Sequence, residues 1–488
     1  MASDPRLLPA SSLRNWGPSL GVGILCFLSF FSRTSTFAGV AESLGIATCV
    51  AFIAASVPFL MRRWPAPSFG CAAVGGLVSI LTLSPPTTHL KGQTPIVLIT
   101  IDTFRADHVN ENTPHLLSLA SEGVRFTNAI TTAPLTAPAH ASLLTGLDVD
   151  VHGLRKNGGL TDSPTIVEHL RAKGWRTGAF VSANVLGRHT HLDRGFEHYD
   201  DRFSLRARWA GAFGLFRTGA KSRSGADTVE RALSWLGSGE STFLWIHLYD
   251  AHLPYAPPAE FRPTPDQLSA LKAADRNDES VHPEGRHGSE GKAMYAAETR
   301  WVDALVGRIV AGTSRETRVI AVADHGEALG EHEYWFNHGA MLHEPAVHIP
   351  MIVRWPGTLA AGSSNPQLTS ITAVHDWIGA MAGLNAPPIA IQKVLAFTPG
   401  QQNRRSKNRE APKPQVIAGF RYADSKLVAA AGSGAQFFDL SLDPYELSPQ
   451  PVPAGLTDDA AALALHLDAP LSASSEEKER LKALGYVE

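Results

Sequence analysis

The sequence predicts an α/β domain, built on a mainly parallel sheet with helices on both faces, that follows an apolar N-terminal region. Short apolar runs rich in Val and Ile suit buried parallel strands. Helical stretches lie between these runs, and such alternation is typical of a mainly parallel sheet. The N-terminal region is set apart by its charge, because only four residues between positions 17 and 90 are charged.

The composition excludes several classes of protein. With 44% hydrophobic and 18% charged residues among 488, the chain is too apolar to be a disordered protein. A net charge of −3 argues against a nucleic-acid binder that relies on bulk positive charge. The three cysteines, Cys26, Cys49 and Cys71, all lie in the N-terminal region. A disulfide scaffold, a cysteine zinc site and a cysteine nucleophile are therefore excluded from the domain.

The N-terminal region, residues 1–90, is predicted to be a membrane region with about three transmembrane helices. Three apolar runs, Leu20–Phe31, Phe37–Met61 and Phe69–Leu83, are near the lower limit for crossing a bilayer, where about 20 residues is typical. The alternative is a signal peptide followed by buried soluble helices. The apolar region is much longer than a signal peptide and lacks a clear cleavage site, which disfavours that alternative.

The distribution of arginines predicts the topology of this region. Arg6 and Arg14 precede the first run, and Arg62 and Arg63 separate the second from the third. The positive-inside rule places these arginines in the cytoplasm. With three spans, the chain after about Pro85 is periplasmic or extracellular, as in a bacterial inner-membrane protein. Two spans would reverse this orientation.

The elements of the domain follow a polar linker that ends at Pro95. The catalytic unit is predicted over residues 95–395, with a basic linker over 396–415 and a small C-terminal antiparallel subdomain over 416–488. Residues 261–291 are predicted to be an irregular insertion. The predicted strands are Ile96–Ile101, Ala179–Ser182, Phe243–Leu248, Val319–Ala323 and Met351–Val353, with Lys426–Ala429 and Phe437–Leu440 in the subdomain. The predicted helices are Thr113–Gly123, Ser163–Lys173, Ala226–Leu236, Lys292–Ala311 and Ser370–Met381.

Carboxylates and imidazoles follow three of the predicted strands. Asp102 follows the first strand, Asp324 and His325 follow Val319–Ala323, and Asp250 and His252 follow Phe243–Leu248. Ligands of open α/β sheets bind at the carboxyl ends of strands. One such aspartate is explained as a helix cap, but three strand ends of this kind favour a metal site. Oxygen and imidazole ligands without thiolate suit zinc or manganese better than calcium.

A second informative segment is Leu135–Gly146, in which prolines precede a helical run. The segment predicts a loop that enters a helix N-terminus, where free N–H groups and the helix dipole favour anions. Thr136 lies at that entry. Its hydroxyl either caps the helix or, beside a metal ion, is activated as a nucleophile.

Taken together, these pieces resemble the sulfatase-like branch of the alkaline-phosphatase superfamily. The matching segments occur in family order from about residue 95 to the C-terminus. They are Ile99–His108, Thr136–Gly146, His152–Gly153 with Asn157, Tyr249–Tyr255, Asp324–His332, His338–Gly339, Ile349–Gly357, Phe438–Leu440 and Asp443–Glu446. The resemblance implies an alkaline-phosphatase-like fold. The chain is similar to the membrane-anchored, threonine-nucleophile type, such as phosphoethanolamine transferases and phosphodiesterases.

The resemblance also implies roles for individual residues. Thr136 takes the position of the nucleophile, and His252 and His338 take positions that hold the anionic group or protonate the leaving group. His140 and Asn157 fall at substrate-binding positions. One divalent ion is expected, and its implied ligands are Asp102, Thr136, Asp324 and His325. A second ion, held by Asp250, His252 and His338, is left open.

Departures from the sulfatase pattern bear on the activity. Sulfatases of this family carry Cys or Ser at the nucleophile position and convert it to formylglycine, which Thr136 cannot form. His140 stands where the sulfatase motif has Arg, and Thr103 replaces the second of two paired aspartates. The implied function is therefore a membrane-anchored, metal-dependent hydrolase or transferase that acts on phosphate esters (phosphodiester or phosphoethanolamine type) or sulfate esters.

Two alternatives remain for that function. The first is an arylsulfatase-like sulfuric ester hydrolase, and the second is a catalytically inactive sulfatase-fold membrane protein. The expected partners are an anionic ester, lipid-linked or from the cell envelope, and the membrane itself. Neither nucleic acid nor an obligate protein partner is expected.

Overall fold

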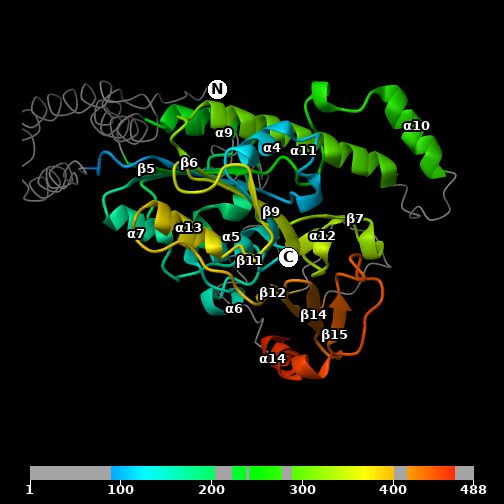
Figure 1. Ribbon diagram of the computed structural model, residues 1–488. Coiled ribbons are helices and arrows are strands. Elements are labelled where there is room, and N and C mark those ends of the chain that lie inside the picture. The colour runs from blue at the N-terminus through cyan, green and yellow to red at the C-terminus, as the bar shows by residue number, and fades with distance from the viewer. Residues whose placement is uncertain (1–88, 204–221, 238–240, 277–287, 400–414, 468–488) are drawn as a thin grey trace, which may run out of the picture. The chain divides into compact units, whose positions relative to one another are not determined.

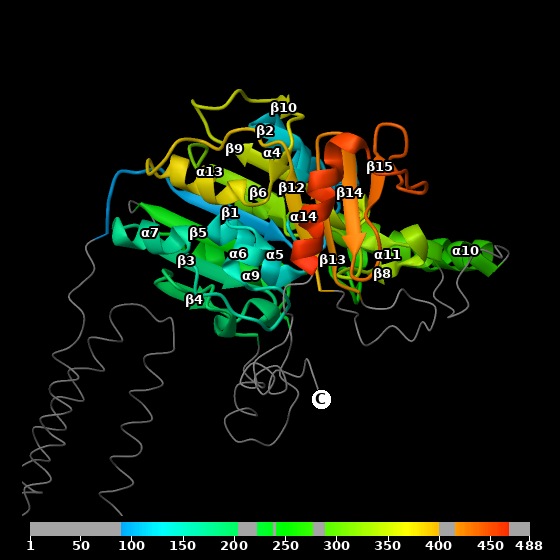
Figure 2. The ribbon, with the colours of Figure 1, turned by 90° about the horizontal axis from the view of Figure 1, so that it is seen from below.

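A computed structural model describes residues 89–203, 222–237, 241–276, 288–399 and 415–467 (Figures 1 and 2). Their central sheet has the strand order β10-β2-β9-β6-β1-β5-β3-β4, with β11 beside β2. All of its strands run in one direction except β9, which is antiparallel to both β2 and β6. The strands are β1 (Ile96–Ile101), β2 (Val124–Ile130), β3 (Arg176–Val181), β4 (His198–Asp200), β5 (Thr242–Leu248), β6 (Arg318–Ala323), β9 (His348–Arg354), β10 (Ser363–Asn365) and β11 (Thr369–Ser370). The predicted mainly parallel sheet is confirmed.

Helices cover both faces of this sheet, as predicted (Figure 1). One face carries α4 (Pro114–Ser121), α9 (Gly225–Trp235) and α11 (Gly288–Ala311). The other face carries α5 (Thr136–Thr145), α7 (Ile166–Ala172) and α13 (Ala373–Met381), and the short α6 (Val149–His152) follows α5. Local sequence signals start several of these helices. In α7, the Thr165 hydroxyl accepts from the Glu168 amide and the Glu168 carboxylate accepts from the Thr165 amide, which forms a capping box.

The core lies around the central strands. Every residue of β1 and of β5 is buried, because helices cover both faces and parallel neighbours cover both edges. The sequences of strands in that position are nearly continuous apolar runs, without the alternation of apolar and polar residues seen in half-exposed strands. This burial explains why β1 and β5 were predictable from sequence, and it fixes the positions of the residues that follow them.

The segment predicted to be an irregular insertion is helical over much of its described length, so that prediction is wrong there. Helix α10 occupies Pro265–Arg276, and α11 begins at Gly288. The start of α10 has a local cause, because Thr264 and Gln267 form a reciprocal pair of side chain to backbone hydrogen bonds. With Pro265 at the first helical position, this is a recognisable helix start. Residues 277–287 lie outside the described residues.

The C-terminal subdomain contains an antiparallel sheet, as predicted, but with more strands than expected. Its order is β12-β13-β14-β15, formed by Val394–Thr398, Ile417–Arg421, Ser425–Ala430 and Gln436–Asp439. Helix α14 (Thr457–Leu467) packs on β13 and β14 (Figure 2). The first strand, β12, extends into residues 396–398, so the prediction that the linker begins at residue 396 is wrong, and residues 400–414 of that linker lie outside the described residues. Two short elements, α12 (Glu344–Val347) and the β7–β8 pair (Ala328–Leu329 and Trp335–Asn337), lie between β6 and β9 in sequence.

The predicted membrane spans fall in residues 1–88, outside the part of the chain that the structure describes. Among the described residues, no helix combines the length and the apolar character needed to cross a bilayer. The three-span region therefore stays a prediction.

Candidate active site

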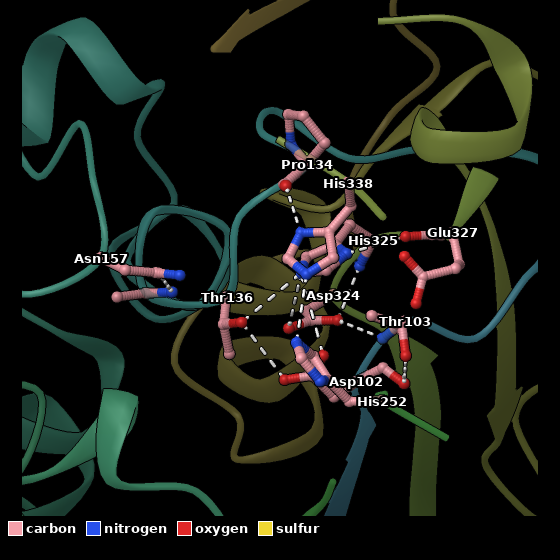
Figure 3. Close-up of polar contacts among 12 residues, drawn as sticks. Asp102, Thr103, Pro134, Thr136, Asn157, His252, Asp324, His325, Glu327 and His338 are labelled. Atoms are coloured by element: carbon pink, nitrogen blue, oxygen red, sulfur yellow. Dashed lines mark hydrogen bonds and ion pairs between the residues drawn. The ribbon is translucent and has the colours of Figure 1, made fainter. Parts of the chain in front are cut away.

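Two neighbouring strand ends bring the predicted metal ligands together (Figure 3). Asp102 follows β1 and Asp324 follows β6, and the last residues of these strands are paired in register. His325 comes next in the chain, and its Nε2 lies 3.9 Å from Asp102 Oδ1 and 3.7 Å from Asp324 Oδ2. All three side chains are fully buried. The parallel sheet thus places three donors at one point of its carboxyl edge.

The free atoms of this group suit a divalent cation. Asp102 Oδ1 and Asp324 Oδ2 are buried without a hydrogen-bond partner, which is costly for carboxylate oxygens. His325 Nδ1 lies 2.9 Å from the Gly326 carbonyl. A carbonyl only accepts, so Nδ1 donates and Nε2 keeps a lone pair that faces the carboxylates. Ligand atoms of the three residues all lie within 4.8 Å of one another, a spacing at which they could hold one ion.

The pKa shifts of the two carboxylates also favour a bound cation. Burial and the neighbouring charge of Asp102 raise the pKa of Asp324 well above its usual range. Burial also raises the pKa of Asp102, but interactions with His247, His252 and His325 outweigh it and leave that pKa below its usual range. A bound cation removes the repulsion between the carboxylates, so the residues present fit a metal ion.

Thr136 faces the same point from the start of α5. Leu135 occupies the N-cap position, and Thr136 is the first helical residue. Its hydroxyl donates to Asp102 Oδ2 over 3.2 Å, and its Oγ1 lies 3.5 Å from His325 Nε2. The interpretation of Thr136 as a helix cap is therefore wrong. Its hydroxyl lies among the candidate metal ligands, at a helix N-terminus that favours an anion.

His252 and His338 form a pair beside this group (Figure 3). Their Nε2 atoms are 3.2 Å apart, while His252 Nδ1 donates to the Leu253 carbonyl and His338 Nδ1 donates to the Pro134 carbonyl. Because a carbonyl only accepts, both Nδ1 atoms carry a proton, and the two Nε2 atoms face each other at a distance that suits one shared proton or another positive centre between them. The His338 ring centroid is 4.3 Å from that of His325, so the pair adjoins the metal ligands.

The structure does not bring Asp250 to this histidine pair. Asp250 Oδ1 accepts from the Gly225 amide and from Trp301 Nε1, each over 3.0 Å. Its carboxylate thus meets the N-terminus of α9 and the side of α11. Within the described residues, two groups have metal-ligand spacing: Asp102, Asp324 and His325, and His140, His247 and Asp324. Neither group contains Asp250, His252 or His338.

This placement predicts that Asp250 acts through stability rather than through a metal. We expect Asp250→Ala to keep the metal content of the protein and to lower its free energy of unfolding. In this variant the Gly225 amide and Trp301 Nε1 each lose their acceptor, and a buried donor left without an acceptor costs about 1–3 kcal/mol. Denaturant unfolding and metal analysis measure the two effects, with Asp250→Asn as the control that keeps an acceptor oxygen. Loss of metal at unchanged stability would contradict this prediction.

His140 and Asn157 contact the first turn of α5. His140 is fully buried, its Nδ1 donates to the Thr136 carbonyl over 2.8 Å, and its Nε2 lies 3.0 Å from Thr100 Oγ1. Burial and the nearby His247 lower the pKa of His140 to about 3, so the ring is neutral. Asn157 Oδ1 accepts from the Ala137 amide over 2.9 Å. Substrate binding by His140 and Asn157 stays a prediction.

His247 was not identified from sequence, and Thr103 was identified only as the replacement of a paired aspartate. His247 lies inside β5 and is fully buried, with its Nε2 3.6 Å from Asp102 Oδ2. The available signal was a single imidazole within an otherwise apolar strand. Thr103 has a positive φ of 54°, which is uncommon for a β-branched residue. Its amide donates to Asp324 Oδ1 and its hydroxyl to the Asp102 carbonyl, so Thr103 links the two strand ends.

The comparisons with known proteins agree with this geometry. The family model described as Sulfatase matches residues 94–384, which is more than half of the chain. The uncharacterized sulfatase YidJ of Escherichia coli (strain K12) is 25% identical over 290 residues, which cover 50% of this chain and 58% of that protein. Arylsulfatase K of Mus musculus is 23% identical over 448 residues, which cover 76% of this chain and 80% of that protein.

A solved structure is similar in fold. The phosphonate monoester hydrolase from Silicibacter pomeroyi has a TM-score of 0.57 at 20% identity, with 77% of this chain and 94% of that chain covered. The match to the family model covers β1, α5 and β6, and therefore includes Asp102, Thr136, Asp324 and His325. The chain belongs to the sulfatase family and is an enzyme of that family.

Proposed function

We propose that this protein is a membrane-anchored, metal-dependent hydrolase or transferase that cleaves phosphate or sulfate esters with Thr136 as the nucleophile. One observation carries the proposal: the Thr136 hydroxyl opens α5 and lies among Asp102, Asp324 and His325. A hydroxyl at a helix N-terminus, beside buried carboxylates with free oxygens, is suited to attack an anionic ester.

In the proposed reaction, Asp102, Asp324, His325 and Thr136 hold the cation. When bound, the cation lowers the pKa of the Thr136 hydroxyl and screens the negative charge of the substrate. Once its hydroxyl proton has passed to solvent, Oγ1 of Thr136 attacks phosphorus or sulfur in line with the leaving oxygen, and the bond to that oxygen breaks as the new ester forms. His252 or His338 donates a proton to the departing oxygen. Water or another hydroxyl then takes the group from Thr136.

Phosphate esters are the favoured substrate class within this proposal. Threonine has no route to formylglycine, the group that sulfatases of this family use, and keeps an ordinary hydroxyl. A second candidate, sulfate-ester hydrolysis, is favoured by the similarity to arylsulfatase K. A substrate screen on the purified full chain separates the two candidates. We expect metal-dependent turnover of phosphodiesters or phosphomonoesters that exceeds turnover of sulfate esters.

The screen has two outcomes that contradict the favoured class. Turnover of sulfate esters alone would identify the arylsulfatase-like alternative. A metal-loaded, folded protein that turns over none of these esters would favour the catalytically inactive alternative. A lipid-linked or cell-envelope ester fits the proposed membrane anchor, because an anchored enzyme meets substrates of the same surface.

The proposed anchor predicts where the catalytic domain lies. The motivating pattern is three apolar runs with Arg62 and Arg63 between the second and the third. We expect a reporter that is active only outside the cytoplasm to be active when fused after Thr94. The matched control is a reporter that is active only in the cytoplasm, fused at the same position. Activity of the cytoplasmic reporter alone would contradict the three-span arrangement.

A further inference from the structure

His247 is a buried polar side chain that the proposed reaction does not use. It is fully buried in β5, and neither Nδ1 nor Nε2 has a hydrogen-bond partner. Burying an unpaired polar group costs free energy, and most buried polar groups in proteins are paired with protein, water or an ion. Nε2 lies 3.6 Å from Asp102 Oδ2, which is too far for a hydrogen bond, so the other groups around His247 indicate what occupies this position.

Two further donors surround His247. Ligand atoms of His247, His140 and Asp324 lie within 4.8 Å of one another, and all three residues are buried. Asp324 Oδ2, which has no hydrogen-bond partner, is 3.6 Å from His140 Nδ1. Two imidazoles and a carboxylate form a ligand set that suits zinc or manganese. This group shares Asp324, but not His325, with the first metal position.

The surroundings of His140 allow it to act as a ligand. Its Nδ1 now donates to the Thr136 carbonyl, and its Nε2 contacts the Thr100 hydroxyl. To bind a cation, Nδ1 must give up its proton and with it the hydrogen bond to the Thr136 carbonyl. The proton then sits on Nε2, from which the Thr100 oxygen can accept a hydrogen bond. Metal-ligating histidines usually donate their other N–H to such a partner. Trp245 Nε1 also donates to Thr100 Oγ1 over 2.9 Å, which fixes that hydroxyl.

We propose that His140, His247 and Asp324 bind a second divalent cation next to the first, with Asp324 shared between the two. Two-metal sites with a spacing of about 3.5–4 Å are common in enzymes that cleave phosphate esters. Two divalent ions on Asp102 and Asp324, with neutral histidines, leave a surplus of positive charge that suits an anionic ester. The role of this charge in binding an ester rests on the proposed function, whereas the cation site itself does not.

The test counts manganese ions on the full-length protein. After metal removal and reloading with Mn²⁺ alone, we expect about two ions per chain and an electron paramagnetic resonance spectrum of two coupled ions. We expect His247→Ala to bind about one ion and to give the spectrum of an isolated ion. If the alanine variant does not fold, His247→Gln replaces it, because glutamine keeps the volume of the side chain. We expect this variant also to bind about one manganese ion per chain.

The matched control is His252→Ala, which alters a neighbouring histidine outside the group and should retain both ions. A single ion in the parent protein would overturn the proposal, as would two ions in a folded His247 variant. Loss of one ion in His252→Ala but not in His247→Ala would place the second cation at the histidine pair instead. Because the readout is metal content, failure to find a substrate leaves the result unaffected.

Discussion

Thr136→Ala is expected to fold and bind metal but to lose turnover by a factor on the order of a thousand or more. The hydroxyl donates to Asp102 Oδ2 and makes a longer contact with His325 Nε2, and it does not cap α5. Its loss therefore costs only about 1 kcal/mol of stability. Loss of a covalent nucleophile removes the attacking atom itself, and its effect falls on kcat. Steady-state kinetics and denaturant unfolding measure the two effects separately.

Two variants control this experiment. Thr136→Ser keeps the hydroxyl and should retain activity. Thr145→Ala alters another buried threonine of α5, whose hydroxyl donates to the Ala141 carbonyl over 2.7 Å, and should leave kcat nearly unchanged. In the parent protein, mass spectrometry of an acid-quenched reaction should find the transferred group on the peptide that contains Thr136. Turnover by Thr136→Ala near the parental rate would mean that water attacks directly.

Asp324→Ala is expected to strip the tightly held metal and to abolish turnover. Asp324 is buried beside Asp102, and its free Oδ2 faces His325. A metal ion contributes several kcal/mol of charge stabilisation in the transition state, and each 1.36 kcal/mol is a factor of ten in rate. We therefore expect at least about a thousandfold loss of turnover. Metal analysis after dialysis, together with kinetics, tests both parts.

Asp324→Asn is the matched variant for this prediction. Oδ1 of Asp324 accepts from the amides of Thr103 and His325, and an asparagine oxygen can keep both bonds. The asparagine variant should thus preserve the local backbone while it weakens the metal site. Circular dichroism and thermal unfolding establish that each variant is folded. Full metal content and full activity in Asp324→Ala would mean that the metal position is wrong.

Much of this site was predictable because its residues directly follow strands or begin a helix that the local sequence pattern predicts. Asp102, Asp324 and His325 each follow an apolar strand that is buried on both faces, and parallel strands end at the same edge. The sequence around Thr136 likewise predicts a helix entry, and α5 begins at Thr136. The roles of His252 and His338 needed the resemblance, since no local pattern brings residues from two distant segments into contact.

Other features depend on tertiary structure and escaped prediction. His247 appears in sequence as one polar residue in a core strand, and only the packing shows that its ring faces Asp102. The φ of Thr103 is fixed by contacts with Asp324 and Tyr295 that lie far along the chain. Helix α10 is a different case, because its capping pair at Thr264 was visible in the sequence but was outweighed by the polar composition of the segment.

The wide separation of the metal ligands along the chain links the site to folding of the whole domain. Thr103, next to Asp102, and Asp324 meet across 221 residues of sequence, so the unfolded chain presents no comparable set of donors. A cation that binds only the folded state stabilises it by mass action, by about 2.7 kcal/mol when the free ion is at a hundred times its dissociation constant. An ion bound at this site would thus act as a long-range crosslink, and we expect chelation to weaken the fold of the domain as well as its chemistry.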